Sequence, residues 1–114
     1  MTQAEIQTML DGVGIPTAYY QFPNGTEVAP PFICFYFDSS ADVYADNSNY
    51  QRIDHLVIEL YSREKDFSLE RTLENILRSH GLTWSKSETF LDDDLMLYDS
   101  YDIDILITEE LNNG

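Results

Sequence analysis

The side chains of this 114-residue chain that could carry covalent chemistry are one cysteine and two histidines. A cysteine thiolate acts as a nucleophile when a histidine within hydrogen-bond reach takes its proton and a third group orients that histidine. Cys34, however, stands between Ile33 and Phe35 in an apolar run, where a small buried thiol is usually inert. His80 closes the apolar stripe of a predicted helix, where an imidazole commonly meets the last carbonyl groups. Pairing of Cys34 with His55 or His80 is therefore not expected to form a catalytic site.

Two groups of aspartates could bind a cation or act as paired carboxylates. Asp92, Asp93 and Asp94 are consecutive, so in an extended segment their side chains point apart. A calcium loop also needs a glycine at its sixth position and a glutamate at its twelfth, and these positions hold leucine and isoleucine here. Asp102 and Asp104 share one face of a predicted strand, which we interpret as a solvent or lumen face. We expect no metal site at either group.

Sequence motifs of common enzymes are missing as well. The chain contains no G-x-x-x-x-G-K-[ST], no G-x-G-x-x-G, no H-E-x-x-H and no G-x-S-x-G pattern. Its single cysteine excludes an intramolecular disulfide and fits a reducing compartment. We therefore expect a protein that is not an enzyme, with no catalytic residue and no cofactor.

The charge balance is strongly acidic, with 21 acidic against 6 basic residues and a formal net charge of -15. Such a surface repels phosphate backbones and anionic lipids, which argues against direct binding of nucleic acids or membranes. Two interpretations stay open: a surface that keeps the protein soluble, or carboxylates lining a channel through which DNA slides without sticking. No apolar run reaches the ~20 residues that cross a bilayer, and the first residues lack a secretory pattern. We expect a soluble protein made in the cytoplasm.

The hydrophobic pattern predicts one α+β domain over residues 1–114, with a mainly antiparallel sheet of four to five strands. Thr2 and Glu5 form a capping box that opens a short helix, and a longer helix that ends before Gly81 is expected to pack on the sheet. In the last strand, apolar side chains should face one way and Asp102 and Asp104 the other. Strands are predicted at 17–22, 32–37, 55–61, 83–91 and 96–108.

The longer helix is expected to divide its side chains between the sheet and the solvent. Its apolar face, closed by His80, carries Leu69, Leu73, Ile76 and Leu77. Its opposite face carries Glu70, Arg71, Glu74 and Arg78. The spacing of Glu74 and Arg78 predicts an ion pair along this solvent-facing side.

Residues 38–49 are polar and lack the periodicity of a helix or a strand, so we expect a protruding loop or arm at about 38–50. Asp46 and Asn47 lie in this segment, with Tyr44 and Tyr50 beside them. Tyrosine suits an interface because it buries a large area and keeps a polar end. The arm either stays solvated or docks on a neighbouring subunit, and in the second case these four residues form the oligomer interface.

Several segments, spread over roughly residues 16–109, form a pattern that is shared with a known family. They are the aromatic-Pro-Asn-Gly turn at Tyr20, Phe22, Pro23, Asn24 and Gly25, the strand start Pro30-Pro31-Phe32, Tyr44-Ala45-Asp46-Asn47 with Tyr50, Ile58-Glu59-Leu60-Tyr61, and the helix with Glu70, Glu74 and Leu77. In this pattern the chain resembles phage and prophage tail-completion proteins of the tail-terminator type, from long-tailed phages of Gram-positive bacteria.

The resemblance implies a structural protein of phage assembly. Tail terminators form a ring, typically a hexamer, that caps the finished tail tube and presents a surface to the head. The implied partners are further copies of the chain, the tail tube protein and a head-completion or connector protein. The implied location is the head–tail interface of the virion, after assembly in the cytoplasm of the bacterial host. The first candidates for channel-facing acids are then Asp92, Asp93, Asp94, Asp102 and Asp104.

Three other functions compete with this one. A head–tail adaptor or joining protein of the connector would share the size, charge and α+β content. An acidic DNA mimic that inhibits a host DNA-binding protein would need carboxylates spaced like phosphates on one face, whereas here they are scattered along the chain. A hydrolase built on Cys34 would lose its activity in a Cys34→Ala variant, which the structural interpretation expects to be harmless.

Overall fold

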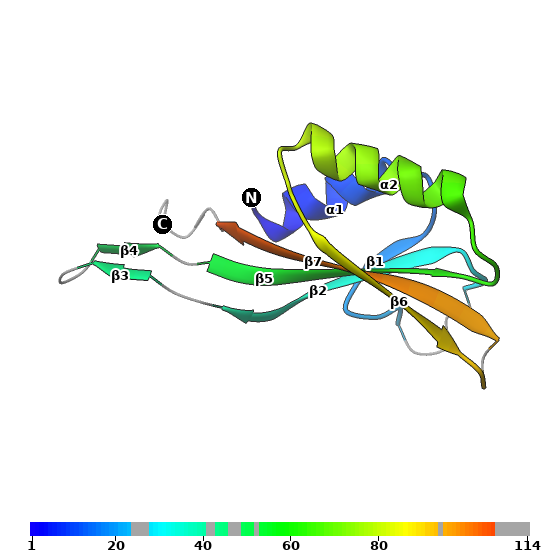
Figure 1. The fold of residues 1–114 in the computed structure, drawn as a ribbon. Helices are drawn as coiled ribbons and strands as arrows, with labels where there is room; N and C mark the ends of the chain where they lie inside the picture. Colours follow the sequence, from blue (N-terminus) through cyan, green and yellow to red (C-terminus); the bar gives the residue numbers. More distant parts are fainter. Residues whose placement is uncertain (24–27, 41–42, 46–48, 52, 94, 107–114) are drawn as a thin grey trace.

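Two helices lie on one face of a five-stranded sheet in the computed structural model, which describes residues 1–23, 28–40, 43–45, 49–51, 53–93 and 95–106 (Figure 1). The helices are α1 (Gln3–Asp11) and α2 (Phe67–Ser79). The sheet has the order β1-β2-β5-β7-β6, formed by β1 (Thr17–Tyr19), β2 (Phe32–Ser40), β5 (Ile53–Ser62), β7 (Met96–Leu106) and β6 (Ser85–Leu91). This arrangement confirms the predicted α+β class. None of the helices in the described ranges is long and apolar enough to span a membrane.

The sheet is antiparallel except at one edge. Strand β5 lies between β2 and β7 and is antiparallel to both, and β6 completes the other edge. Strand β1 instead runs parallel to β2, with Thr17 opposite Ile33. The turn at Pro23, Asn24 and Gly25 would suit an antiparallel pair, because parallel strands need a longer connection, and Asn24 and Gly25 lie outside the described residues. The strand is also shorter than predicted, since Tyr20 turns out of it at a φ of 70°.

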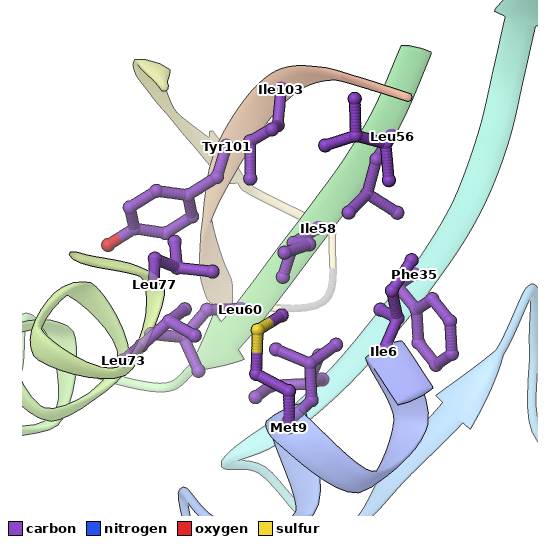
Figure 2. Packing of buried hydrophobic residues seen from close by; sticks show 13 residues of the cluster. Ile6, Met9, Phe35, Leu56, Ile58, Leu60, Leu73, Leu77, Tyr101 and Ile103 are labelled. Atoms are coloured by element: carbon purple, nitrogen blue, oxygen red, sulfur yellow. The ribbon is translucent and has the colours of Figure 1, made fainter. Parts of the chain in front are cut away.

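The core fills the space between the sheet and the helices (Figure 2). Alternate side chains of the central strands point into it, as a period of two requires. In β7 these are Tyr101, Ile103 and Ile105, which are buried, whereas Asp102 and Asp104 lie on the other side. The predicted alternation is thus confirmed for the described part of this strand. The helices contribute Ile6, Met9, Leu10, Leu73 and Leu77.

The helix ends follow the capping signals in the sequence. Thr2 and Glu5 form the predicted capping box, in which each side chain accepts a hydrogen bond from the other residue's backbone. At the end of α2, Gly81 has a φ of 75°, a left-handed conformation that favours glycine. His80 Nδ1 lies 3.0 Å from the carbonyl oxygen of Ile76, as expected of an imidazole at a helix end.

The charged side of α2 differs from the prediction. Glu70 is only 5% exposed, because it faces the β6–β7 edge of the sheet and not the solvent. Glu74 Oε2 accepts a hydrogen bond from Lys86 Nζ at 2.7 Å, in place of the predicted partner Arg78. Arg78 instead donates to an asparagine one turn earlier and lies over the ring of Trp84. Helical spacing placed these residues on one side of α2 but could not show that β6 lies beside it.

The polar segment after residue 38 contains strands that the sequence did not predict. Strand β2 extends to Ser40, and a separate two-stranded sheet is formed by β3 (Val43–Ala45) and β4 (Asn49–Gln51). Figure 1 shows this hairpin, hereafter the arm, beyond the ends of β2 and β5. Backbone hydrogen bonds can join polar residues as well as apolar ones. A hairpin with no buried face therefore does not need the alternation of apolar and polar residues by which strands are predicted.

Candidate interaction site

Both helices cover the same side of the sheet, and the described elements leave the other side uncovered (Figure 1). We call this side the open face. The strand registers place on it Phe32, Cys34 and Tyr36 of β2, His55, Val57, Glu59 and Tyr61 of β5, and Tyr98, Ser100, Asp102 and Asp104 of β7. A sheet side that carries this much aromatic surface is a candidate for binding a partner.

An aromatic row crosses the open face and consists of Phe22, Phe32, Tyr61 and Tyr98. The ring of Phe32 stacks on that of Tyr61 with centroids 4.8 Å apart, and Tyr61 stacks on Tyr98 at 5.1 Å. Phe22 meets Phe32 edge-on at 5.5 Å. All four residues are only partly buried, so the row is ordered by its own contacts and keeps area for another surface.

Glu59 organises the tyrosines around it. Its carboxylate accepts a hydrogen bond from the Tyr61 hydroxyl at 2.8 Å and one from the Tyr36 hydroxyl at 3.3 Å. Burial, together with the charge of Glu59, raises the pKa of Tyr36 to about 12 and the pKa of the Cys34 thiol to about 11. The tyrosines therefore stay neutral donors, and the thiol stays protonated, the form that is not nucleophilic.

His55 lies between two of the predicted channel acids. Its Nδ1 is 3.0 Å from Asp104 Oδ1, and its Nε2 is 3.3 Å from Asp102 Oδ1. The hydrogen bond with Asp104, followed by that with Asp102, raises the pKa of His55 against an opposing effect of burial. The structure does not bring His55 to Cys34, because Cys34 lies opposite Glu59 and His55 lies opposite Asp104.

The other predicted site residues fall in separate places. Asp92 and Asp93 are exposed at the turn between β6 and β7, and Asp94 lies outside the described residues. In the arm, the backbone register pairs Tyr44 with Tyr50. Asp46 and Asn47 also lie outside the described residues. The candidate acids are thus divided between the turn at one end of β7 and the His55 contact near its other end.

A second group of charged residues lies on the covered side, between α2 and the β6–β7 edge. This ionic cluster consists of Lys65, Glu70, Glu74, Lys86, Glu88 and Asp99, and it is held by hydrogen bonds from the two lysines. Helical spacing does not reveal this cluster, because it places Glu70 and Glu74 only on the charged side of α2, which was expected to face the solvent. The one sequence signal for the cluster is Asp99, which stands among the inward-facing residues of β7. This signal can be interpreted only once the strand register is known.

Comparison with known proteins gives a structural similarity alone. No protein-family model matches the chain, and no curated protein matches it either. Nine chains of solved structures match it. One of them belongs to a structure described as the virion of a native gene transfer agent particle. It aligns with a TM-score of 0.58 and 12% sequence identity over 92% of this chain and 85% of that chain. At this identity the match shows a common fold.

Proposed function

We propose that this protein is a structural subunit of a phage-type virion, and specifically a tail-terminator or tail-completion subunit that joins the tail to the head. The observation that carries the proposal is the shared fold with a chain of a gene transfer agent virion, which covers nearly the whole of both chains. The segment pattern that resembles tail terminators supports the narrower role. The proposed location is the head–tail interface of the virion, and the proposed assembly is a ring, with six subunits as the first expectation.

Two unlike surfaces of the chain support a ring. The open face presents an aromatic row beside Glu59, Asp102 and Asp104, so a two-fold contact of this face with itself would oppose like charges. The arm is a two-stranded hairpin, which on its own is marginally stable and gains from docking. Residues 43–50 contain a single charged residue, Asp46. The arm of one subunit on the open face of the next is a head-to-tail contact, and contacts of this kind close into rings when the rotation between neighbouring subunits closes.

In this proposal the interface residues of the arm are Tyr44, Asp46, Asn47 and Tyr50. The acids at the β6–β7 turn, Asp92, Asp93 and Asp94, are the first candidates for the channel wall. Asp102 and Asp104 are weaker candidates, because both carboxylates contact His55, and a protonated imidazole offsets their negative charge. The partners on either side of the ring are the tail tube protein and a head-completion or connector protein.

The first test is the mass of the protein in solution, measured by light scattering over a wide concentration range with and without purified tail tubes. A discrete ring, either alone or on tube ends, is the expected result. A protein that stays monomeric and ignores tubes would overturn the terminator role. A ring that binds the connector but not the tube would assign the protein to the head–tail adaptors instead.

A pair of matched variants tests the proposed ring contact. Ser100→Arg places a long cation in the middle of the open face without removing an aromatic ring, and it should abolish the ring. Ser79→Arg makes the same change at the exposed end of α2, where a cation favours the helix dipole, and it should leave the ring intact. Circular dichroism checks that both variants are folded. A ring that survives Ser100→Arg would exclude the open face as a ring contact.

A further inference from the structure

The ionic cluster beneath α2 contains more carboxylates than cations. Lys65 Nζ lies 3.0 Å from Glu70 and also bonds to Glu88. Lys86 Nζ lies 2.7 Å from Glu70 and 2.7 Å from Glu74. These contacts pair three glutamates with two ammonium groups. They leave the fourth carboxyl group, that of Asp99, without a lysine of its own.

Asp99 is the most enclosed member of the cluster. Asp99 is 1% exposed, and its Oδ1 has no hydrogen-bond partner. One carboxylate oxygen from each of Glu70, Glu88 and Asp99 lies within 4.8 Å of the other two. On the β5 side, Asp99 lies opposite the buried Leu60, whose side chain can offer neither a charge nor a hydrogen bond. A buried oxygen without a partner costs free energy, so this arrangement calls for one more positive charge or donor.

We propose that the cluster is a buried proton-binding site: Asp99 is protonated in the folded protein and donates this proton to the carboxylate of Glu70 or Glu88. The proton then fastens α2, which carries Glu70, to the β6–β7 edge, which carries Glu88 and Asp99. This inference does not depend on the proposed function, because it concerns the contact between α2 and the sheet within one subunit.

The electrostatic setting favours Asp99 over the glutamates as the proton carrier. Burial, and then the neighbouring Glu88 and Glu70, raise the pKa of Asp99 to about 7. Burial also acts to raise the pKa of Glu70, but hydrogen bonds from Lys86 and Lys65 outweigh it and lower this pKa. The hydrogen bond from Lys65 likewise lowers the pKa of Glu88. Two carboxyl groups this close do not ionise independently, and the one without an ammonium partner keeps the proton.

Further charged and titratable groups face the cluster from each element packed against it. Lys65 precedes α2, and Glu74 of α2 accepts from both Lys86 of β6 and the hydroxyl of Tyr101 of β7. Hydrogen bonds from these two residues lower the pKa of Glu74 against the effect of burial. Glu74 therefore competes with Asp99 for cations and does not supply a proton.

The sign of the resulting pH dependence follows from proton binding. An aspartate in the unfolded chain has a pKa of about 3.9, and that of Asp99 in the folded protein is about 7. Between these values the folded state binds more protons at Asp99 than the unfolded state, so the contribution of Asp99 to stability falls as the pH rises and is lost above about 7. The lowered pKa values of the glutamates act in the opposite direction, and their contribution is lost only in acid.

Asp99→Asn tests the proposal in the full chain, because an amide keeps a hydrogen on this side chain at every pH. Thermal unfolding of the wild type should shift to lower temperature between pH 5 and pH 8. This shift should be smaller in Asp99→Asn, which should be the more stable protein at pH 8. Asp92→Asn removes an exposed aspartate and should retain the wild-type shift. Equal shifts in wild type and Asp99→Asn would overturn the proposal.

A second measurement needs no variant and covers the case in which Asp99→Asn does not fold. Carbon NMR of the aspartate side chains should show one carboxyl group that titrates near pH 7, within about one unit. The absence of such a group would overturn the proposal. Calcium or manganese chloride at pH 8 should not raise the unfolding temperature; a rise that Asp99→Asn abolishes would instead assign the site to a divalent cation.

Discussion

The two sides of the sheet are built from alternate residues of the same strands, but they differ in which groups lack a partner. On the covered side, β7 presents Tyr101 and Ile103 to a closed core, yet the same row holds Asp99 with an unpaired oxygen. On the open face, the charged groups of β5 have hydrogen-bond partners, since Glu59 accepts from two tyrosines and His55 lies between two aspartates. The covered side therefore needs one bound proton to satisfy Asp99, whereas the open face needs a partner surface to cover its aromatic row. The first should govern stability, and the second association.

The largest expected contrast between the sides comes from two phenylalanines of β2. Phe35 is fully buried beneath α1, so Phe35→Ala should cost about 3–5 kcal/mol of unfolding free energy. Phe32 lies on the open face and is partly exposed, so Phe32→Ala should cost about 1–2 kcal/mol. Urea denaturation of both variants measures these values. An equal loss would mean that the open face is already a core surface within one subunit.

A medium effect should come from the stacked rings of the open face. Tyr61 and Tyr98 lie with ring centroids 5.1 Å apart and close to parallel. A double-mutant cycle with Tyr61→Leu and Tyr98→Leu should give a coupling energy of about 0.5–1.5 kcal/mol, because leucine keeps apolar area but removes the stacking. Unfolding at low protein concentration, where the proposed ring would not form, isolates this coupling energy. Additive losses would show that the row is not preformed and is ordered only by a partner.

The smallest effect should come from His55. Its pKa is raised in the folded protein, so its contribution is fully present below the unfolded value of about 6.5 and is lost as the pH rises through the folded pKa. Because solvent screens these contacts, the contribution should stay below about 1 kcal/mol. His55→Asn should remove it, as measured by the unfolding temperature at pH 5.5 and pH 8.5.

His55 and Asp99 both make the protein less stable as the pH rises, which allows the two sides to be compared directly. Each variant should remove its own part of the shift, and the double variant His55→Asn with Asp99→Asn should remove both. Sites this far from direct contact are expected to add. A double variant that behaves like Asp99→Asn alone would show that His55 contributes nothing.

The sequence predicted what depends on local periodicity and missed what depends on register. The alternation of β7, the capping box at Thr2 and the helix end at Gly81 are local signals, and the structure confirms them. The contact of His55 with Asp104 joins residues that are far apart in the chain and become neighbours only once β5 and β7 are aligned. No local pattern specifies that alignment.

The same limit explains the wrong assignment of the charged side of α2. Helical spacing correctly separates Glu70 from the apolar stripe, but whether that side meets water or β6 depends on tertiary packing. The interface prediction for Tyr44 and Tyr50 stays a prediction, and the pairing of β3 with β4 shows only that the backbone places them opposite each other.

The arm is joined to the rest of the chain through two strands that are already neighbours. Strands β2 and β5 pair as far as Ser40 and Asp54, and neighbouring antiparallel strands can be connected by a turn of two residues. The sheet therefore does not need the arm for its topology, and insertions or deletions there leave its hydrogen bonds in place. The arm can therefore be lengthened, shortened or exchanged without rebuilding the core, and such variants would show whether association depends on it while the fold stays unchanged.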